Sequence, residues 1–183
     1  MRKITAAINM TIDGNCDHTA GLADEELHDH YTELLGEGDV ILYGRTTYQL
    51  MEFWRTFLEK PSETKSMNDF AVAINNIPKI VFSRTLNSVD WRSASIANQG
   101  LEETVLEMKR QVGKNILVGS RSLITQLIGL NLIDEFQLCI QPVVAGNGLR
   151  LFEDISERPV FRLTKTRTFN NGAIILYYQP RDR

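Results

Sequence analysis

Three polar segments follow apolar runs typical of buried strands, and each carries groups that bind phosphate. In chain order they are Gly44-Arg45-Thr46-Thr47, Ser83-Arg84-Thr85 and Gly119-Ser120-Arg121-Ser122. Glycine lets the backbone approach a ligand closely, and free amides at a helix start attract anions. Serine and threonine hydroxyls add donors, and arginine offers a bidentate fork. Together these segments indicate a ligand with several phosphate groups.

The position of these segments in a sheet decides whether they act together. The carboxyl ends of neighbouring parallel strands lie on one edge of an open α/β sheet, where ligands usually bind. One such segment alone is an ordinary helix cap. Three of them at consecutive strand ends predict a site for an elongated dinucleotide.

Hydrophobic periodicity predicts the elements that carry these segments. Strands are expected at residues 3–10, 39–43, 79–83, 115–119, 134–144, 162–169 and 173–180, and helices at 24–35, 44–51, 68–76, 101–112 and 120–131. Residues 54–66 are expected to form a surface excursion. The pattern predicts a single α/β domain over residues 1–183. It has three α/β/α layers and a mixed, mostly parallel, twisted sheet with antiparallel C-terminal strands.

Composition excludes several classes of protein. The 183 residues include 20 Lys and Arg against 23 Asp and Glu, a net charge of −3, and 43% of residues are hydrophobic. No basic run is present to bind nucleic acid, and no apolar run approaches the roughly 20 residues that span a membrane. We therefore expect a cytoplasmic protein. Cys16 and Cys139 form neither a metal-binding pair nor a disulfide framework.

Other motifs carry less chemistry. Residues 146–148 resemble part of a nucleotide-binding glycine motif but are better explained as a turn, since no helix follows. His28 and His30 lie two positions apart on one helix, so they cannot form an i, i+4 metal pair, and no metal site is expected. Both are expected to be solvated, with His28 also a candidate pocket residue.

The blocks at residues 4–14, 41–51, 75–86 and 116–152 resemble the dihydrofolate reductase superfamily. Within it they look most like the reductase domain of the riboflavin-biosynthesis deaminase-reductase. The resemblance implies NADPH bound in an extended conformation across the sheet edge. It assigns Gly44 to Thr47 to the pyrophosphate, Ser83 and Arg84 to the 2′-phosphate, and the stretch from Gly119 through Ser120, Arg121 and Ser122 to Leu123 to a second pyrophosphate loop. This chain has Ser120 where the family usually has a second glycine.

The same resemblance assigns the nicotinamide end of the site. It implies that the backbone near Ala7 contacts the carboxamide and that Ile12, Asp13 and Gly14 form the loop over the ring. A folate reductase carries an acidic residue on its first helix, and the corresponding position in this chain lies near His28. Because no carboxylate occupies that position, folate reduction is disfavoured. Asp13 is either a positioning group, a member of a proton relay or a turn former. The proton donor is water admitted by Asp13, or Asp24, or His28.

The expected function is an NADPH-dependent reductase that transfers a hydride to a small pyrimidine- or pterin-like heterocycle. It would resemble a 5-amino-6-(5-phosphoribosylamino)uracil reductase or a dihydrofolate reductase. The H-x-E and P-C-x-x-C signature of a deaminase is not present. The alternative is a non-catalytic nucleotide-binding or regulatory module of the same fold, and a weaker one is a structural dimer. Relatives of this kind imply a homodimer, in which the apolar strands at residues 134–140 and 173–178 pair or pack across a two-fold axis.

Overall fold

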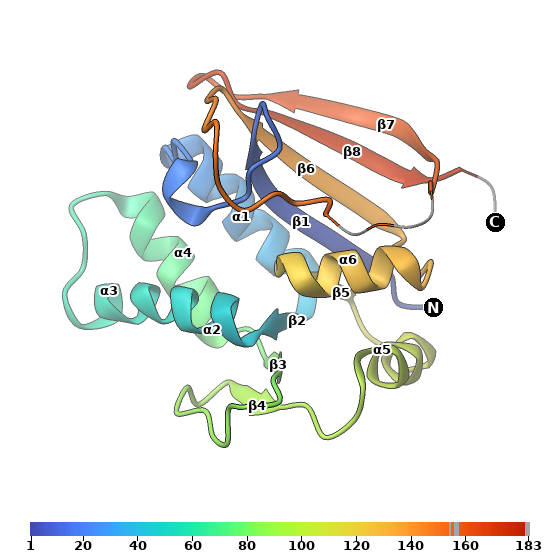
Figure 1. Cartoon of the computed structure of the whole chain (residues 1–183). Helices are drawn as coiled ribbons and strands as arrows, with labels where there is room; N and C mark the ends of the chain where they lie inside the picture. The colour runs from blue at the N-terminus through green and yellow to red at the C-terminus, as the bar shows by residue number, and fades with distance from the viewer. Residues whose placement is uncertain (154, 156–157, 182–183) are drawn as a thin grey trace.

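The fold is described from a computed structural model that covers residues 1–153, 155 and 158–181 (Figure 1). Within these residues, eight strands form one sheet: β1 (Ile4–Thr11), β2 (Gly38–Gly44), β3 (Lys79–Phe82), β4 (Ala94–Ile96), β5 (Asn115–Val118), β6 (Glu135–Gln141), β7 (Phe161–Thr168) and β8 (Ile174–Pro180). The α-helices of the same residues are α1 (Glu25–Glu37), α2 (Arg45–Met51), α3 (Thr56–Glu59), α4 (Lys65–Asn76), α5 (Leu101–Arg110) and α6 (Arg121–Gly129). Two 3-10 helices, η1 (His18–Ala20) and η2 (Glu52–Arg55), complete them.

The strand order confirms the predicted mixed sheet. The order is β4-β3-β2-β5-β1-β6-β8-β7, and the pairs from β4 to β6 are parallel. Strand β8 runs antiparallel to both β6 and β7. The antiparallel strands therefore lie at one side of the sheet, as predicted. Because β8 is paired on both sides, its backbone cannot pair with a second copy of the chain.

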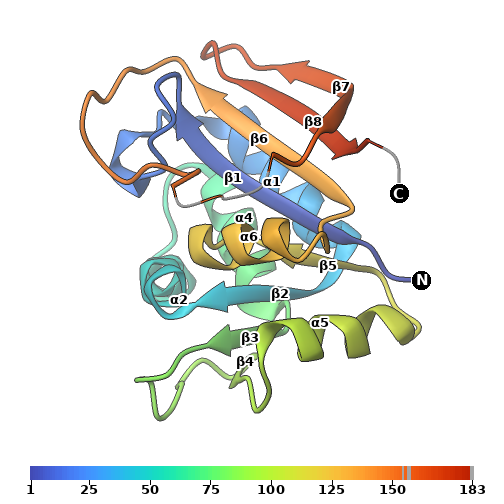
Figure 2. The same cartoon turned by 45° about the vertical axis from the view of Figure 1, so that its right-hand side comes forward.

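Helices cover both faces of the sheet and give the three predicted layers (Figure 2). Helices α5 and α6 pack on one face, where Val105, Ile124 and Leu127 join Ile4 and Leu42 in one core. Helices α1 and α4 pack on the other face in a second core. The alternation along β1 explains this division, because its even-numbered residues all point to the α6 side. In the described residues, no helix is long and apolar enough to cross a membrane.

Part of the surface excursion expected at residues 54–66 is helical, because η2 and α3 extend to Glu59. Its aromatic side chains have a surface to bury: Trp54 lies 4.5 Å from Phe70 between ring centroids, and Phe57 lies 5.6 Å from Trp54. Aromatic contacts of this kind stabilise by about 0.5–1.5 kcal/mol beyond their buried area. Packing against α4 thus orders a stretch whose polar composition predicts a loop.

A strap, defined here as residues 143–153, returns from β6 across the face that α6 covers (Figure 2). It pairs with the loop after β1: the Ile12 amide donates to the Val143 carbonyl at 2.9 Å, and the Cys16 amide donates to Leu149 at 2.8 Å. Leu151 is fully buried in the α6-side core and pins the strap to the sheet. The loop after β1 is therefore held by a segment far away in the sequence.

Candidate nucleotide-binding edge

The three phosphate-seeking segments lie side by side at the carboxyl edge of the sheet. They follow β3, β2 and β5, which are consecutive in the strand order and parallel. Direct contacts join them: Arg45 Nη1 donates to Thr85 Oγ1 at 2.6 Å, and the Gly44 amide donates to Ser120 Oγ at 2.8 Å. The predicted common edge is thus present in the structure.

Ser120 uses its side chain across strands. It is 1% exposed, and although it is the N-cap residue of α6, its hydroxyl does not bond the first turn of that helix. The hydroxyl instead accepts from Gly44. A Cβ added at Gly44 would lie 3.2 Å from Ser122 Oγ, which is tight, so glycine permits this close approach of the two segments. The Gly44 amide is consequently already paired with a protein oxygen.

At the start of α6, two of the expected binding residues, Arg121 and Leu123, already have hydrogen-bond partners within the protein. The Leu123 amide donates to the Ser120 carbonyl at 3.1 Å, so it is used within the turn. Arg121 turns away toward the strap, where Nε donates to the Arg150 carbonyl at 2.6 Å and Nη2 to Glu153 at 2.9 Å. This cation therefore fastens the strap to α6. The contact of Arg121 with a phosphate stays a prediction.

The segment after β3 forms a tight turn that carries the exposed Arg84. Ser83 Oγ accepts from the Thr85 amide at 3.2 Å and from the Leu86 amide at 2.9 Å, which shapes a tight turn. Arg84 at its tip is exposed, and among the described residues it has no hydrogen bond or ion pair. Thr46 and Thr47 lie in the first turn of α2, which follows the neighbouring strand β2, and Thr46 is exposed. A guanidinium without protein partners among the described residues suits a phosphate group.

At this edge, strand β1 extends beyond its pairing with β5. Its pairing with β5 ends at Ala6 opposite Val118, whereas β1 continues to Thr11 in register with β6. A Cβ added at Gly119 would lie 3.8 Å from the Ala7 carbonyl oxygen, in ordinary contact. The main chain from Ala7 onward therefore lacks a β5 partner at the place where the predicted nicotinamide contact lies.

Asp13 holds the loop that carries Ile12. Its carboxylate accepts from the amides of Ala145 at 3.1 Å and Gly146 at 2.8 Å, and from Asn15 Nδ2 at 3.0 Å. A further bond from the Thr11 hydroxyl contributes most to lowering the pKa of Asp13 to about 2. An ionised carboxylate with these partners is a poor proton donor. The contacts favour the positioning role among the alternatives left open by the sequence, and Ile12 beside it is 62% exposed.

The candidate groups on α1 have different surroundings. Asp24 is the N-cap, and its carboxylate accepts from the Leu27 amide at 2.9 Å, which is the structural role of a capping acid. His28 is half-buried against aromatic rings, 5.5 Å from Trp54 and 6.3 Å from Phe70 between centroids. Burial lowers the pKa of His28, so the ring is neutral near neutral pH. Of the two, His28 is the one in contact with the aromatic rings of η2 and α4.

The expectation that His30 is solvated is wrong. His30 is 6% exposed and lies under β7 and β8, with Nδ1 3.2 Å from Arg167 Nη1. Burial, followed by the charge of Arg167, lowers the pKa of His30 to about 4. A neutral ring accepts the arginine hydrogen bond, so His30 is a structural residue. Nothing in its local sequence indicates a partner 137 residues away.

Sequence reasoning missed a polar cluster on β1 and β6. Asn9 is exposed on β1, and its Oδ1 accepts from Tyr31 on α1 and Gln141 on β6. An available signal was the asparagine itself, because this residue is unfavourable inside an apolar strand. The cluster lies two residues beyond Ala7, on the α1 side of β1.

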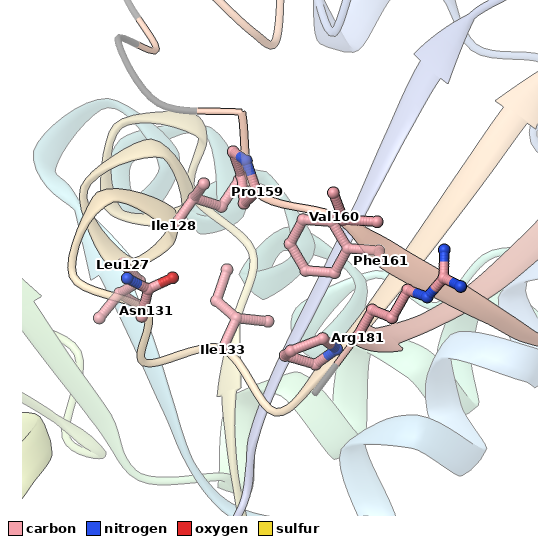
Figure 3. A pocket seen from close by; sticks show the side chains of 9 residues that line it. Leu127, Ile128, Asn131, Ile133, Pro159, Val160, Phe161 and Arg181 are labelled. Atoms are coloured by element: carbon pink, nitrogen blue, oxygen red, sulfur yellow. The ribbon is translucent and has the colours of Figure 1, made fainter. Parts of the chain in front are cut away.

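A cavity of about 380 Å³ lies at the opposite edge of the sheet, between the end of α6 and the ends of β7 and β8 (Figure 3). Ile128 and Ile133 face Val160 and Phe161 across it, and the guanidinium of Arg181 points away (Figure 3). This cavity holds none of the phosphate-seeking segments. In the described residues, no group of three or more His, Cys, Asp or Glu side chains could hold a metal ion.

Comparison with known proteins identifies the family. The family model for the RibD C-terminal domain matches residues 2–175. The chain belongs to the RibD C-terminal domain family. It is 35% identical to the uncharacterized protein YyaP of Bacillus subtilis (strain 168), across 97% of this chain and 94% of that protein. This assignment confirms the resemblance seen in the sequence.

Solved structures of the RibD-like group share the fold. A candidate riboflavin biosynthesis protein from Shewanella sp. PV-4 superposes with a TM-score of 0.73 at 15% identity, over 98% of this chain and 99% of the other. A diaminohydroxyphosphoribosylaminopyrimidine deaminase/5-amino-6-(5-phosphoribosylamino)uracil reductase from Thermotoga maritima gives 0.66 at 16% identity, over 98% of this chain. The match covers 57% of that longer protein.

Proposed function

We propose that this protein is an NADPH-dependent reductase that transfers a hydride to a small pyrimidine- or pterin-like heterocycle. The carboxyl edge carries this proposal, because three phosphate-seeking strand ends stand in a row next to the open side of β1. Membership of the RibD C-terminal domain family and the reductase name of the Thermotoga maritima relative support it. NADPH supplies the hydride chemistry when it is bound, and the protein supplies orientation and electrostatics.

The residues of the edge fit such a cofactor. Arg84, which has no hydrogen bond or ion pair within the part of the chain that the structure describes, offers a cation at the outer end of the row, suited to a 2′-phosphate. The uncapped start of α6 and the first turn of α2 offer backbone amides and hydroxyls for a pyrophosphate. The open main chain from Ala7 onward offers hydrogen-bonding groups for a carboxamide. The strap and the loop that Asp13 anchors would shield a ring at that position from water.

The test of this proposal compares the two nicotinamide cofactors by calorimetry. A charged hydrogen bond contributes about 1.5–3 kcal/mol, so Arg84 should favour NADPH over NADH by roughly ten- to hundredfold. Arg84→Ala should remove most of this preference. Arg92→Ala is the matched control, because Arg92 lies at the opposite, amino edge of the sheet. Its neighbour Ser93 accepts a hydrogen bond from the amide of Lys79, the first residue of β3. No saturable NADPH binding, or equal binding of NADH by the unaltered protein, would refute the role of Arg84.

A non-catalytic nucleotide-binding module is the second candidate. It is favoured by two observations: the carboxylates of Asp13 and Asp24 are engaged in structural bonds, and the Gly44 amide is already paired. NADPH oxidation against a panel of pterins, pyrimidines and flavin precursors separates the candidates. Tight NADPH binding without oxidation of any panel member would favour the module over the reductase.

We also propose that the chain forms a homodimer through a packed face instead of strand pairing. Phe152, Val144 and Leu149 of the strap are between 45% and 68% exposed and lie near the equally exposed Ile12. Exposed apolar groups gathered in this way are typical of interfaces. Light scattering after size exclusion should give about twice the chain mass of 20.8 kDa. A mass of one chain would contradict the proposal.

A further inference from the structure

Asn9 on β1 is placed where its side-chain amide could serve the fold alone or also contact a ligand. It lies on β1 beyond the last residue paired with β5, and it is exposed. The even-numbered residues Ile8 and Met10 pack on the α6 side, so Asn9 faces the α1 side. Its amide either binds only its protein neighbours or also binds a ligand. The hydrogen bonds around it decide which of its two ends is turned outward.

Gln141 fixes the first part of the network. It is 1% exposed, and its Oε1 accepts from the Leu22 amide at 3.2 Å. A backbone amide only donates, so the oxygen of Gln141 must face Leu22 and its Nε2 must face the other way. That Nε2 donates to Asn9 Oδ1 at 3.1 Å and to Cys139 Sγ at 3.4 Å. The orientation of Gln141 therefore requires Asn9 to present its oxygen inward.

Tyr31 supplies the second donor. Its hydroxyl donates to Asn9 Oδ1 at 3.1 Å. Burial raises the pKa of Tyr31 well above its ordinary value, so the phenol keeps this proton. Asn9 Oδ1 now accepts two hydrogen bonds, one for each lone pair. Its Nδ2 retains two N–H donors, and in the described part of the chain no acceptor is found for them.

We propose that Asn9 is a specificity-determining residue whose two outward N–H groups donate to a carbonyl oxygen on the ring of the substrate. The inference rests on the proposed reductase function, and it narrows the substrate class. Tyr31 on α1 is uncharged, as is His28 one turn earlier beside Trp54. The two side chains that bond Asn9, Tyr31 and Gln141, are both uncharged, which suits a neutral heterocycle. A ring that bears amino groups in place of carbonyl groups would set donors against donors.

Two matched probes test this assignment: 6-aminouracil, which carries ring carbonyls, and 2,4,6-triaminopyrimidine, which replaces both carbonyls with amines. Binding is measured by calorimetry with the NADP⁺-loaded protein, at mildly alkaline pH where both probes are uncharged. The unaltered protein should bind 6-aminouracil about five- to tenfold more tightly, the effect of one or two neutral hydrogen bonds. Asn9→Asp presents acceptors in the same shape and should reverse the preference.

Two further variants separate a positioning effect from a general one. Tyr31→Phe loosens the orientation of Asn9 and should bring the preference toward one without reversing it. Asn76→Asp makes the same chemical change at an exposed asparagine at the end of α4, and should leave the preference unchanged. NADP⁺ affinity is measured for every variant and should not differ from that of the unaltered protein.

The outcomes distinguish this inference from the proposed function. If NADP⁺ fails to bind the unaltered protein, the reductase proposal fails and the role of Asn9 fails with it. If NADP⁺ binds equally to all variants but Asn9→Asp keeps the original preference, only the role of Asn9 is overturned. Absence of measurable binding of either probe to the NADP⁺-loaded protein also overturns it.

Discussion

The hydroxyl of Ser120 accepts a hydrogen bond from the amide of Gly44 at 2.8 Å and so joins the end of β5 to the end of β2. Both residues are buried, and the bond lies in the middle of the row of strand ends. The side chain that replaces the usual glycine thus links two of the three polar segments at the carboxyl edge of the sheet. Its removal affects stability and binding separately, and the two effects can be measured.

Ser120→Ala should destabilise the protein, because it leaves the buried Gly44 amide without an acceptor. An unpaired buried donor costs about 1–3 kcal/mol. Urea unfolding measures the change, with Ser88→Ala, an exposed loop serine, as the control. A loss no larger than that of the control would show that water or another group satisfies Gly44.

Asp13→Asn should loosen the strap without unfolding the chain. The amides of Ala145 and Gly146 lose a charged acceptor, so their protection against hydrogen exchange should fall. The folded pKa of Asp13, about 2, lies below its ordinary value of 3.8, so the anchoring is complete above about pH 4 and is lost as pH falls toward 2. NMR protection factors report it, and unchanged protection at both amides in the variant would refute the anchoring role.

His30 should make the protein less stable in mild acid. Its folded pKa of about 4 lies below the ordinary 6.5, so the unfolded chain binds the proton first. Stability from this group is complete above pH 6.5 and declines as pH falls toward 4, by about 1–3 kcal/mol in all. His30→Gln should flatten this decline, whereas His18→Gln, at an exposed histidine, should not. NMR titration of the rings checks the pKa directly.

Lys79 should give the opposite end of the pH profile a slope. It is 1% exposed, and its Nζ donates to the Ile77 carbonyl and to Ser93 at 2.8 Å while lying 4.0 Å from the centroid of the Trp91 ring. Burial lowers the pKa of Lys79 to about 7, against 10.5 for an exposed lysine. Stability should therefore rise with pH above about 7, by at most about 1.4 kcal/mol per pH unit.

Lys79→Met tests that slope. The variant should lose the rise between pH 7 and pH 9 in urea unfolding, and Lys60→Met, at an exposed lysine, should keep it. Because the oxygen acceptors and the Trp91 ring favour the ammonium form, a slope close to zero in the unaltered protein would show that these contacts offset burial.

The sequence was sufficient for the sheet edge but not for its internal contacts. Apolar runs followed by glycine, serine and arginine locate strand ends, since hydrophobic patterning and helix-start chemistry are local signals. The bond from Gly44 to Ser120 spans 76 residues, and that from Gly146 to Asp13 spans 133. Contacts of this kind depend on how the chain folds back, which no local pattern records.

The same distinction applies to individual side chains. The local sequence around His30 and Arg121 is typical of surface residues, yet His30 is buried beside Arg167 of β7 and Arg121 binds Glu153 of the strap. The sequence does not single out Asn9, because the orientation of its amide depends on Tyr31 and Gln141, which come from two other elements. Residue type alone indicated that Asn9 is polar, whereas its orientation required the folded network.

The early end of β5 beside β1 has a consequence for how this fold tolerates change. Whatever enters there meets peptide groups of Ala7 and its successors, which every amino acid except proline provides in full. On the β1 side, the groups that line this opening are therefore main-chain atoms, and on the opposite side they are side chains. Substitutions on the opposite side can therefore change which ligand is recognised while the main-chain groups of β1 stay in place.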